Sequence, residues 1–314
     1  MPQMETISVT EPVGQAIERV KRALFHPFDL GKWFTIGFCA WLAHLGETGG
    51  SFNYNFGPGH HGRGARGGLD RVWGFATANL YWIVPLAIAV VIIGAAIWVI
   101  ILWVSSRGRF MFLHCVATGK AEIDVPWHRF AREGNSLFLF RLVLAAIACV
   151  PMLPLLAGGV VTAVSMIRRD EFDVRGIITL VGLVLALVAV GMVFFVVAKL
   201  TTDFVVPIMF LRGNKCTAAW QQFLGLMSGN VGRFVLYLLF QVVLGMATGA
   251  LVLIVVLVTC CVAGCLMMLP YVGTVLLLPV LMFKRSYSLH YLAQYGSQYD
   301  VFPSVVPPAL TQGQ

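Results

Sequence analysis

Residues 79–104 read NLYWIVPLAIAVVIIGAAIWVIILWV, an apolar run that contains no charged residue. Because a helix rises about 1.5 Å per residue, a run of this length can cross a hydrocarbon core of about 30 Å. Trp82 and Trp103 stand 21 residues apart in the sequence. That separation is about 31 Å along a helix, which matches the spacing of two interfacial aromatic belts. The stretch therefore predicts a transmembrane helix.

The composition of the whole chain is typical of a protein solvated by lipid. Of its 314 residues, 59% are hydrophobic and 11% are charged, and the mean hydropathy is +0.84. A soluble domain usually carries about 25% charged residues, so we expect no separate soluble domain. The formal net charge of +8 is interpreted as the Lys/Arg bias of loops that face anionic lipid. We therefore expect membrane lipids, and no nucleic acid, among the partners.

Apolar runs long enough to cross a hydrocarbon core predict an all-α, polytopic helical bundle of six transmembrane helices. This bundle is expected to form one domain over residues 1–302. The shortest run reaches a spanning length only if its helix starts near Phe28 and Lys32 snorkels to the interface. The tail at 303–314 is expected to be disordered. The six crossings are expected at about 28–46, 79–104, 137–166, 176–203, 234–264 and 267–283.

The distribution of basic residues predicts the orientation. With a cytoplasmic N-terminus, 16 Lys and Arg residues fall on the inside and 6 on the outside. The positive-inside rule then places both the N-terminus and the C-terminus in the cytoplasm. The glycine-rich stretch 47–72 becomes a mobile external loop.

A weak three-fold repeat follows from this topology, because each pair of crossings is preceded by an amphipathic cytoplasmic segment. The segments are 13–25, 125–135 and 216–230. Apolar residues at helical spacing beside basic ones suit a helix in the inner interface, but they equally suit an elbow docked on protein. In the first segment, the predicted apolar face consists of Val13, Ile17, Val20 and Leu24. The candidate surface residues of the three segments are Lys21, Arg22, Trp127 and Trp220.

Two further patterns are expected to lie at helix surfaces. Tyr287, Tyr291 and Tyr295 follow the last crossing at a spacing of four, which favours an aromatic stripe at the inner membrane interface or, alternatively, a partner surface. Gly245 and Gly249 form a G-x-x-x-G motif, which favours close packing of helices within the bundle, with dimerisation as the alternative.

The strongest candidate polar site is the pair Lys199 and Asp203, at i,i+4 near the inner end of the fourth crossing. Ionisable groups inside a membrane are costly, so such a pair is either functional or a neutralised structural pair. Arg141, at the inner end of the third crossing, is a candidate third member of this cluster.

The remaining motifs carry little chemistry. GRGARG at 62–67 lacks the strand and helix that a dinucleotide site requires. His44, His60 and His61 do not complete a metal-ligand set, and Cys260, Cys261 and Cys265 are interpreted as packing residues. No hydrolase elbow, Walker loop or HExxH motif is present. We therefore expect no cofactor, no metal and no enzymatic activity.

The strings LFHPFDLGKWFTIGFCAWL, SSRGRFMFLHCVATGK, TTDFVVPIMFLRGN and FKRSYSLHYLAQYG resemble an uncharacterised family of prokaryotic multi-pass membrane proteins. They are also distantly similar to the membrane domain that accompanies some glycerophosphodiester phosphodiesterases, whose hydrolase half is absent from this sequence. The resemblance implies a prokaryotic inner-membrane location and no known activity. We expect a non-catalytic subunit or scaffold with a membrane-protein partner or a second copy; the alternative is a transporter, channel or lipid-handling protein.

Overall fold

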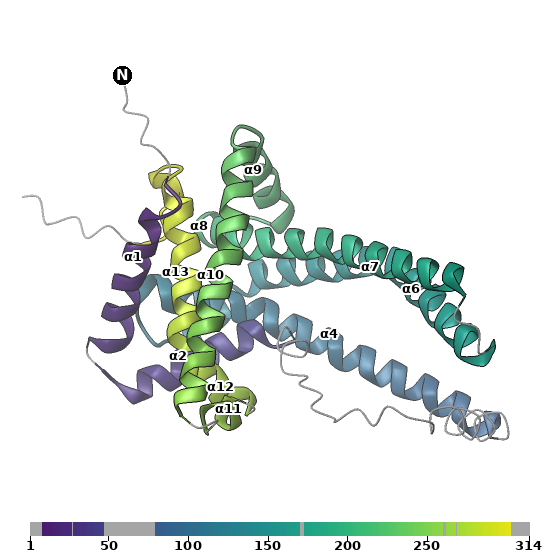
Figure 1. The fold of residues 1–314 in the computed structure, drawn as a ribbon. Coiled ribbons are helices and arrows are strands. Elements are labelled where there is room, and N and C mark those ends of the chain that lie inside the picture. Colours follow the sequence, from purple (N-terminus) through teal and green to yellow (C-terminus); the bar gives the residue numbers. More distant parts are fainter. Residues whose placement is uncertain are drawn as a thin grey trace, which may run out of the picture. The chain divides into compact units, whose positions relative to one another are not determined.

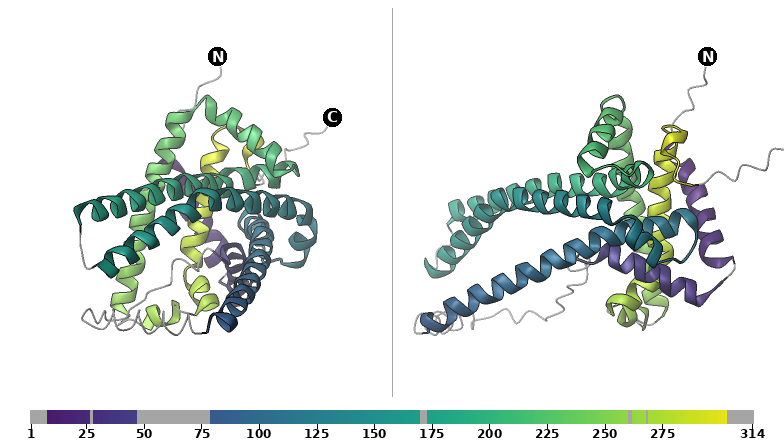
Figure 2. Two further views of the ribbon diagram at one scale, coloured as in Figure 1. Left: turned by 90° about the vertical axis from the view of Figure 1, so that its right-hand side faces the viewer. Right: turned by 180° about the vertical axis from the view of Figure 1, so that it is seen from behind.

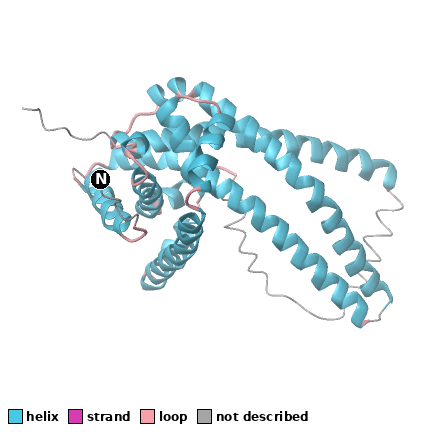
Figure 3. Cartoon of the chain, turned by 90° about the horizontal axis from the view of Figure 1, so that it is seen from above, coloured by secondary structure: helices cyan, strands magenta, loops and turns pink. Residues whose placement is uncertain are grey.

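The computed structural model describes residues 8–26, 28–46, 79–169, 173–259, 262–267 and 269–302. Throughout these ranges every regular element is a helix, which confirms the all-α class (Figure 3). The α-helices are α1 Glu11–Val20, α2 Leu30–His44, α4 Leu80–Thr118, α5 Asp124–Arg129, α6 Ala131–Arg169, α7 Val174–Leu200, α8 Val206–Arg212, α9 Cys216–Ser228, α10 Val231–Val258, α11 Val262–Met267, α12 Pro270–Leu276 and α13 Leu278–Ala293. The others are the π-helices η1 Lys21–Phe25 and η2 Thr201–Val205 and the 3-10 turn η3 Ser297–Tyr299.

Four helical stretches are long and apolar enough to cross a membrane by length and composition. Their most apolar windows have mean hydropathies between 2.3 and 3.0, and at most 6% of any window is buried inside the chain. The four stretches are Tyr81–Thr118, Ala131–Met166, Val174–Arg212 and Val231–Val258. They correspond to the second, third, fourth and fifth predicted crossings.

The first and last predicted crossings have a different form. Helix α2 has 15 residues, which is about 22 Å of helix and short of a full crossing. The predicted last crossing, 267–283, is divided among α11, α12 and α13. Helices α12 and α13 each carry a proline in the first turn, where the missing N–H costs nothing, so proline favours a new helix start there. The count of six crossings and the three-fold repeat stay predictions.

The chain separates into two compact units. The first unit contains Met1–Leu45, Trp103–Phe140 and Lys199–Gln314, and the second contains Gly46–Leu102 and Arg141–Ala198. Three of the four boundaries fall inside α4, α6 and α7, and the fourth follows the end of α2.

The first unit is built on α13, along which α1 packs (Figure 1). Ala16, Val20 and Leu24 are buried in α1 and η1, whereas Ile17 is 43% exposed. The predicted apolar face is therefore wrong at Ile17, because the small side chain of Ala16 lets α13 approach on that side. Arg19 donates hydrogen bonds to the carbonyl oxygens of Val116 and Ala117, which are otherwise unpaired at the end of α4.

Helix α2 also packs closely within the first unit. Tyr271 of α12 donates a hydrogen bond of 2.9 Å to the carbonyl oxygen of Phe34. Gly108 of α4 faces the α2 backbone, because a Cβ there would lie 2.6 Å from the carbonyl carbon of Leu42. The Cys115 thiol lies 3.8 Å from the Cys39 sulfur, in the same buried contact between α2 and α4. These contacts place α2 against protein along much of its length.

The second unit buries little of its apolar surface. In it α6 and α7 run side by side (Figure 2), and a Cβ on Gly158 would come within 3.7 Å of the Leu183 side chain. Within the described part of this unit, Leu102 is the only buried hydrophobic residue. In water such a surface would be costly at roughly 25 cal/mol per Å² of exposed apolar area, so hydrocarbon is its natural solvent.

Candidate functional site: a cation-rich cluster on a π-helix

The π-helix η2 carries buried polar side chains, Thr201 and Asp203, inside the first unit. A π-turn widens the helix, so its carbonyl groups are less regularly paired than in an α-helix, and such turns are frequent at functional sites. The carbonyl oxygen of Thr202 accepts a hydrogen bond from Nη1 of Arg285, which reaches it from α13. The hydroxyl of Thr202 accepts one from Nη1 of Arg109, on α4. Both arginines are more than nine-tenths buried. Three helices thus meet at one turn.

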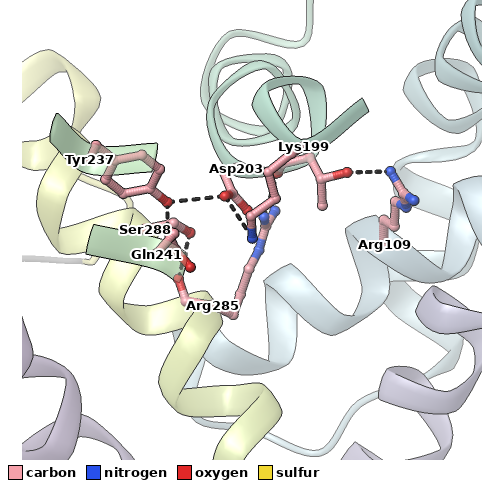
Figure 4. A network of polar contacts seen from close by, with 8 residues as sticks. Arg109, Lys199, Asp203, Tyr237, Gln241, Arg285 and Ser288 are labelled. Carbon is pink, nitrogen blue, oxygen red and sulfur yellow. Dashed lines mark hydrogen bonds and ion pairs between the residues drawn. The ribbon is translucent and has the colours of Figure 1, made fainter. Parts of the chain in front are cut away.

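Asp203 is the carboxylate of this site and is only 5% exposed. Its Oδ2 lies 2.9 Å from Nζ of Lys199 and accepts a hydrogen bond of 3.0 Å from the hydroxyl of Tyr237 (Figure 4). Gln241 donates to the same Tyr237 hydroxyl at 2.8 Å. The predicted contact between Lys199 and Asp203 is therefore present, and Tyr237 and Gln241 of α10 extend it. Whether the two charges depend on each other for stability stays a prediction.

Four cations of the described residues contact η2 or interact electrostatically with Asp203. They are Arg109, Lys199, Lys284 and Arg285, so the formal charge of the group with Asp203 is about +3. Burial lowers the pKa of Arg285 to about 10, and the charge of Arg109 acts in the same direction. Burial and then the charge of Lys199 lower the pKa of Lys284. An excess of positive charge in a partly buried place is suited to binding an anion.

Arg141, the third predicted member, belongs to the second unit. The described cluster consists of residues of the first unit alone. Sequence reasoning did not assign Arg109, Lys284 and Arg285 to the site, because it treated them only as basic residues of cytoplasmic ends. The available signal was Lys284 and Arg285 directly after an apolar run, where a charge near hydrocarbon requires a partner.

The tyrosine stripe is not an exposed surface. Tyr287 and Tyr291 are fully buried, and their hydroxyls donate to the carbonyl oxygens of Val9 and Arg233. Tyr295 lies beside them as a half-buried residue, with its ring stacked on Phe234 at 5.4 Å. The prediction of a lipid or partner surface is therefore wrong for Tyr287 and Tyr291. The cause is that α1, α10 and η2 cover this face of α13.

The two candidate tryptophans pack on protein and are half-buried. Trp127 of α5 meets Trp103 edge-on at 6.2 Å, and the Arg107 guanidinium lies over both rings. Trp220 of α9 packs against Phe140. These contacts match the docked-elbow alternative for the second and third segments.

The first segment keeps an exposed polar face. Lys21 and Arg22 are exposed, and Arg22 pairs with Glu18 at 2.7 Å. Ile17, Phe25 and Phe28 are exposed beside them. This mixture of apolar and basic side chains is typical of a helix at a membrane surface.

Gly245 and Gly249 face open space in the structure. A Cβ on either glycine would meet nothing within 4 Å. Packing against a helix of the same chain, and association with another chain as its alternative, both stay predictions.

The other motifs add no site. His60, His61, GRGARG, Cys260, Cys261 and the tail at 303–314 lie outside the described residues, and Cys265 is exposed on α11. Nδ1 of His44 lies 2.8 Å from the carbonyl oxygen of Ala40, within its own helix. Among the described residues, no group of three or more His, Cys, Asp or Glu side chains could hold a metal ion.

The fold and the cluster together define a helical protein with several helices able to cross a membrane and one cation-rich interior site. The chain belongs to a family of unknown function, DUF7544, whose model matches residues 7–276. Neither a curated protein nor a solved structure matches the chain.

Proposed function

We propose that the chain is a multi-pass protein of the prokaryotic inner membrane, with six crossings and both ends in the cytoplasm, that acts as a non-catalytic subunit or scaffold. The observation that carries this proposal is the exposed apolar surface of the four long helices. At most 6% of the most apolar window of each helix is buried inside the chain. A bundle that were complete by itself would bury one side of each helix. The exposed sides leave room for lipid and for helices of another chain.

The open face of α10 supports the scaffold role. Between transmembrane helices the hydrophobic effect is absent, so association depends on close packing at small residues. Gly245 and Gly249 present such a face, and a Cβ on either would meet no described atom within 4 Å. We propose that this face receives a helix of a partner or of a second copy.

Topology is the first test. Ser51→Cys should add labelling by an impermeant thiol reagent in intact cells, above the background of the native cysteines in the parent. A cysteine added at Thr311 in the C-terminal tail should add none until the cells are opened. Labelling of the tail in intact cells, or release of the chain by alkaline carbonate, would contradict the proposal.

Assembly is the second test. Crosslinking in native membranes, followed by purification in mild detergent, should yield the chain together with one membrane protein or a second copy of itself. Gly245→Ile should reduce that crosslink, whereas Gly94→Ile should leave it unchanged. Gly94 is the matched control because it also lies within an apolar helix with nothing within 4 Å of an added Cβ. A chain that crosslinks to nothing would contradict the scaffold role.

The cation-rich cluster favours a second candidate, a lipid-handling or transport protein. A scaffold has no need of four cations around one buried carboxylate, whereas a protein that holds an anionic headgroup does. Lipid that co-purifies in a fixed ratio, with no protein partner, would favour this candidate.

A further inference from the structure

Among the described residues, Lys199, Lys284 and Arg285 share one carboxylate, that of Asp203. Arg285 is 7% exposed, and its Nη1 is paired with the carbonyl oxygen of Thr202. Its Nη2 is buried and has no hydrogen-bond partner among the residues that the structure describes. Asp203 is the one carboxylate among the electrostatic partners of both Arg285 and Lys284. That carboxylate is already shared between Lys199 and Tyr237.

A buried guanidinium with an unpaired N–H is costly, because a buried donor without a partner loses roughly 1–3 kcal/mol, and more when it is charged. In water this cost is avoided by solvation, and in a protein it is usually avoided by an anion. The Nη2 group of the guanidinium can donate to a phosphate oxygen, and the lysines add point charges. The chemistry of the site therefore selects an oxyanion with spread negative charge.

The two lysines of the cluster are partly exposed. The Lys199 side chain is 29% exposed, and Lys284 is half-buried and makes no ion pair or hydrogen bond with another described residue. The charge of Lys199 lowers the pKa of Lys284, and a bound anion would oppose that effect. Both residues lie at the ends of apolar stretches, at 176–203 and 267–283, where a phospholipid headgroup would sit beside a membrane protein.

We propose that Lys199, Lys284 and Arg285 form a binding site for a phosphate group, with Asp203 holding Lys199 in place. The lipid form of this ligand is an anionic phospholipid headgroup, and the soluble form is inorganic phosphate. The lipid form rests on the proposed membrane location, whereas the phosphate site itself does not.

The test measures thermal unfolding of the full chain purified in a non-ionic detergent. Three additions are compared at constant ionic strength: phosphatidylglycerol in mixed micelles, phosphatidylcholine in mixed micelles, and inorganic phosphate. Phosphatidylglycerol is expected to raise the Tm of the parent protein, and phosphatidylcholine is not. Loss of one cation should raise the half-saturating concentration of phosphatidylglycerol about fivefold. This factor corresponds to about 1 kcal/mol for one basic residue at an anionic surface.

Lys284→Gln is the test variant, because this side chain has no partner among the described residues whose loss would unfold the protein. Lys120→Gln removes the same charge from an exposed position of the first unit and serves as the matched control. Lys284→Arg should restore binding. The site is supported if phosphatidylglycerol binds about fivefold more weakly to Lys284→Gln and as tightly to Lys120→Gln as to the parent. An equal shift in both variants, or no effect of either phosphatidylglycerol or phosphate on the parent, overturns it.

The source of the phosphate group is decided in the same experiment. Stabilisation by phosphatidylglycerol but not by inorganic phosphate assigns the site to a lipid headgroup. Stabilisation by both, with both lost in Lys284→Gln, assigns it to phosphate in general. Carbonate extraction of the same cells tests the membrane location separately, so failure of one proposal is distinguishable from failure of the other.

Discussion

Replacing Asp203 by alanine is the most informative perturbation of the cluster, because one carboxylate serves two helices besides its own. The change removes the acceptor of Lys199 and of Tyr237 and leaves the cations around η2 without their carboxylate. Removing one partner of a buried ion pair costs about 3–5 kcal/mol. The Lys199 side chain is partly exposed and Tyr237 retains Gln241, so we expect about 2–4 kcal/mol here.

Removing the other partner of the ion pair should lower the free energy of unfolding by less. In Lys199→Ala, Asp203 keeps the Tyr237 hydroxyl and the field of Arg285, so we expect a loss of about 1–2 kcal/mol. The double variant should lose less than the sum of the two, with a coupling energy of about 1–2 kcal/mol. Asp203→Asn keeps an acceptor for Tyr237 and should recover about 1 kcal/mol of the alanine loss.

The assay is unfolding of the full chain in detergent by a graded denaturant, with the double-mutant cycle evaluated at 25 °C. The pair Glu18 and Arg22 is the matched control, because it also has i,i+4 spacing and a contact of 2.7 Å, but its side chains are 65% and 75% exposed. Its coupling should be about 0.3–0.5 kcal/mol. A coupling between Lys199 and Asp203 no larger than that of the control would refute the reasoning.

Three further predictions concern other parts of the first unit. Replacing Lys21 and Arg22 by glutamate should weaken association with anionic lipid or with a partner while the fold is kept, as measured by lipid quantification and native mass spectrometry on the purified variant; unchanged bound lipid and partners would make the segment a structural elbow. Burial lowers the pKa of His290 to about 4, below its ordinary value near 6.5, so the folded state holds fewer protons and stability should fall as pH drops from about 6.5 to 4. Because His290 is partly exposed, the loss should be about 1–2 kcal/mol and should disappear in His290→Gln; an unchanged pH profile in that variant would exclude this histidine as the cause. Gly108→Ala places a methyl group against the α2 backbone and should cost about 1–3 kcal/mol in thermal or denaturant unfolding, whereas Gly14→Ala, which has open space, should not; equal stability of the two variants would contradict the close contact.

Features that depend on neighbouring residues in the chain could be predicted from the sequence. Hydropathy is a sum over consecutive residues, so the four long helices are visible in it without any tertiary information. The contact between Lys199 and Asp203 is local too, because residues four apart share a helix face. The helix that contains them changes to a π-helix at Thr201, and no local pattern in the sequence indicated that turn.

Features that depend on which elements meet were not predicted. The spacing of Tyr287 and Tyr291 placed them on one face of a helix, but it did not say whether lipid or protein covers that face. The same holds for Gly245 and Gly249, whose spacing did not say whether a helix of this chain or of another covers them. In a membrane protein both solvents of a helix, lipid and neighbouring helices, are apolar, so hydrophobicity does not distinguish them.

By itself, the sequence determined the helical class, the apolar helices and the local ion pair, since each follows from composition and from a period of 3.6 residues. Only the tertiary structure decided that Arg109 from α4 and Arg285 from α13 converge on Thr202 in η2. The physical reason is that charge is costly only where it is buried. Burial is a property of the packed chain, in which residues about a hundred positions apart in the sequence exclude solvent from one another.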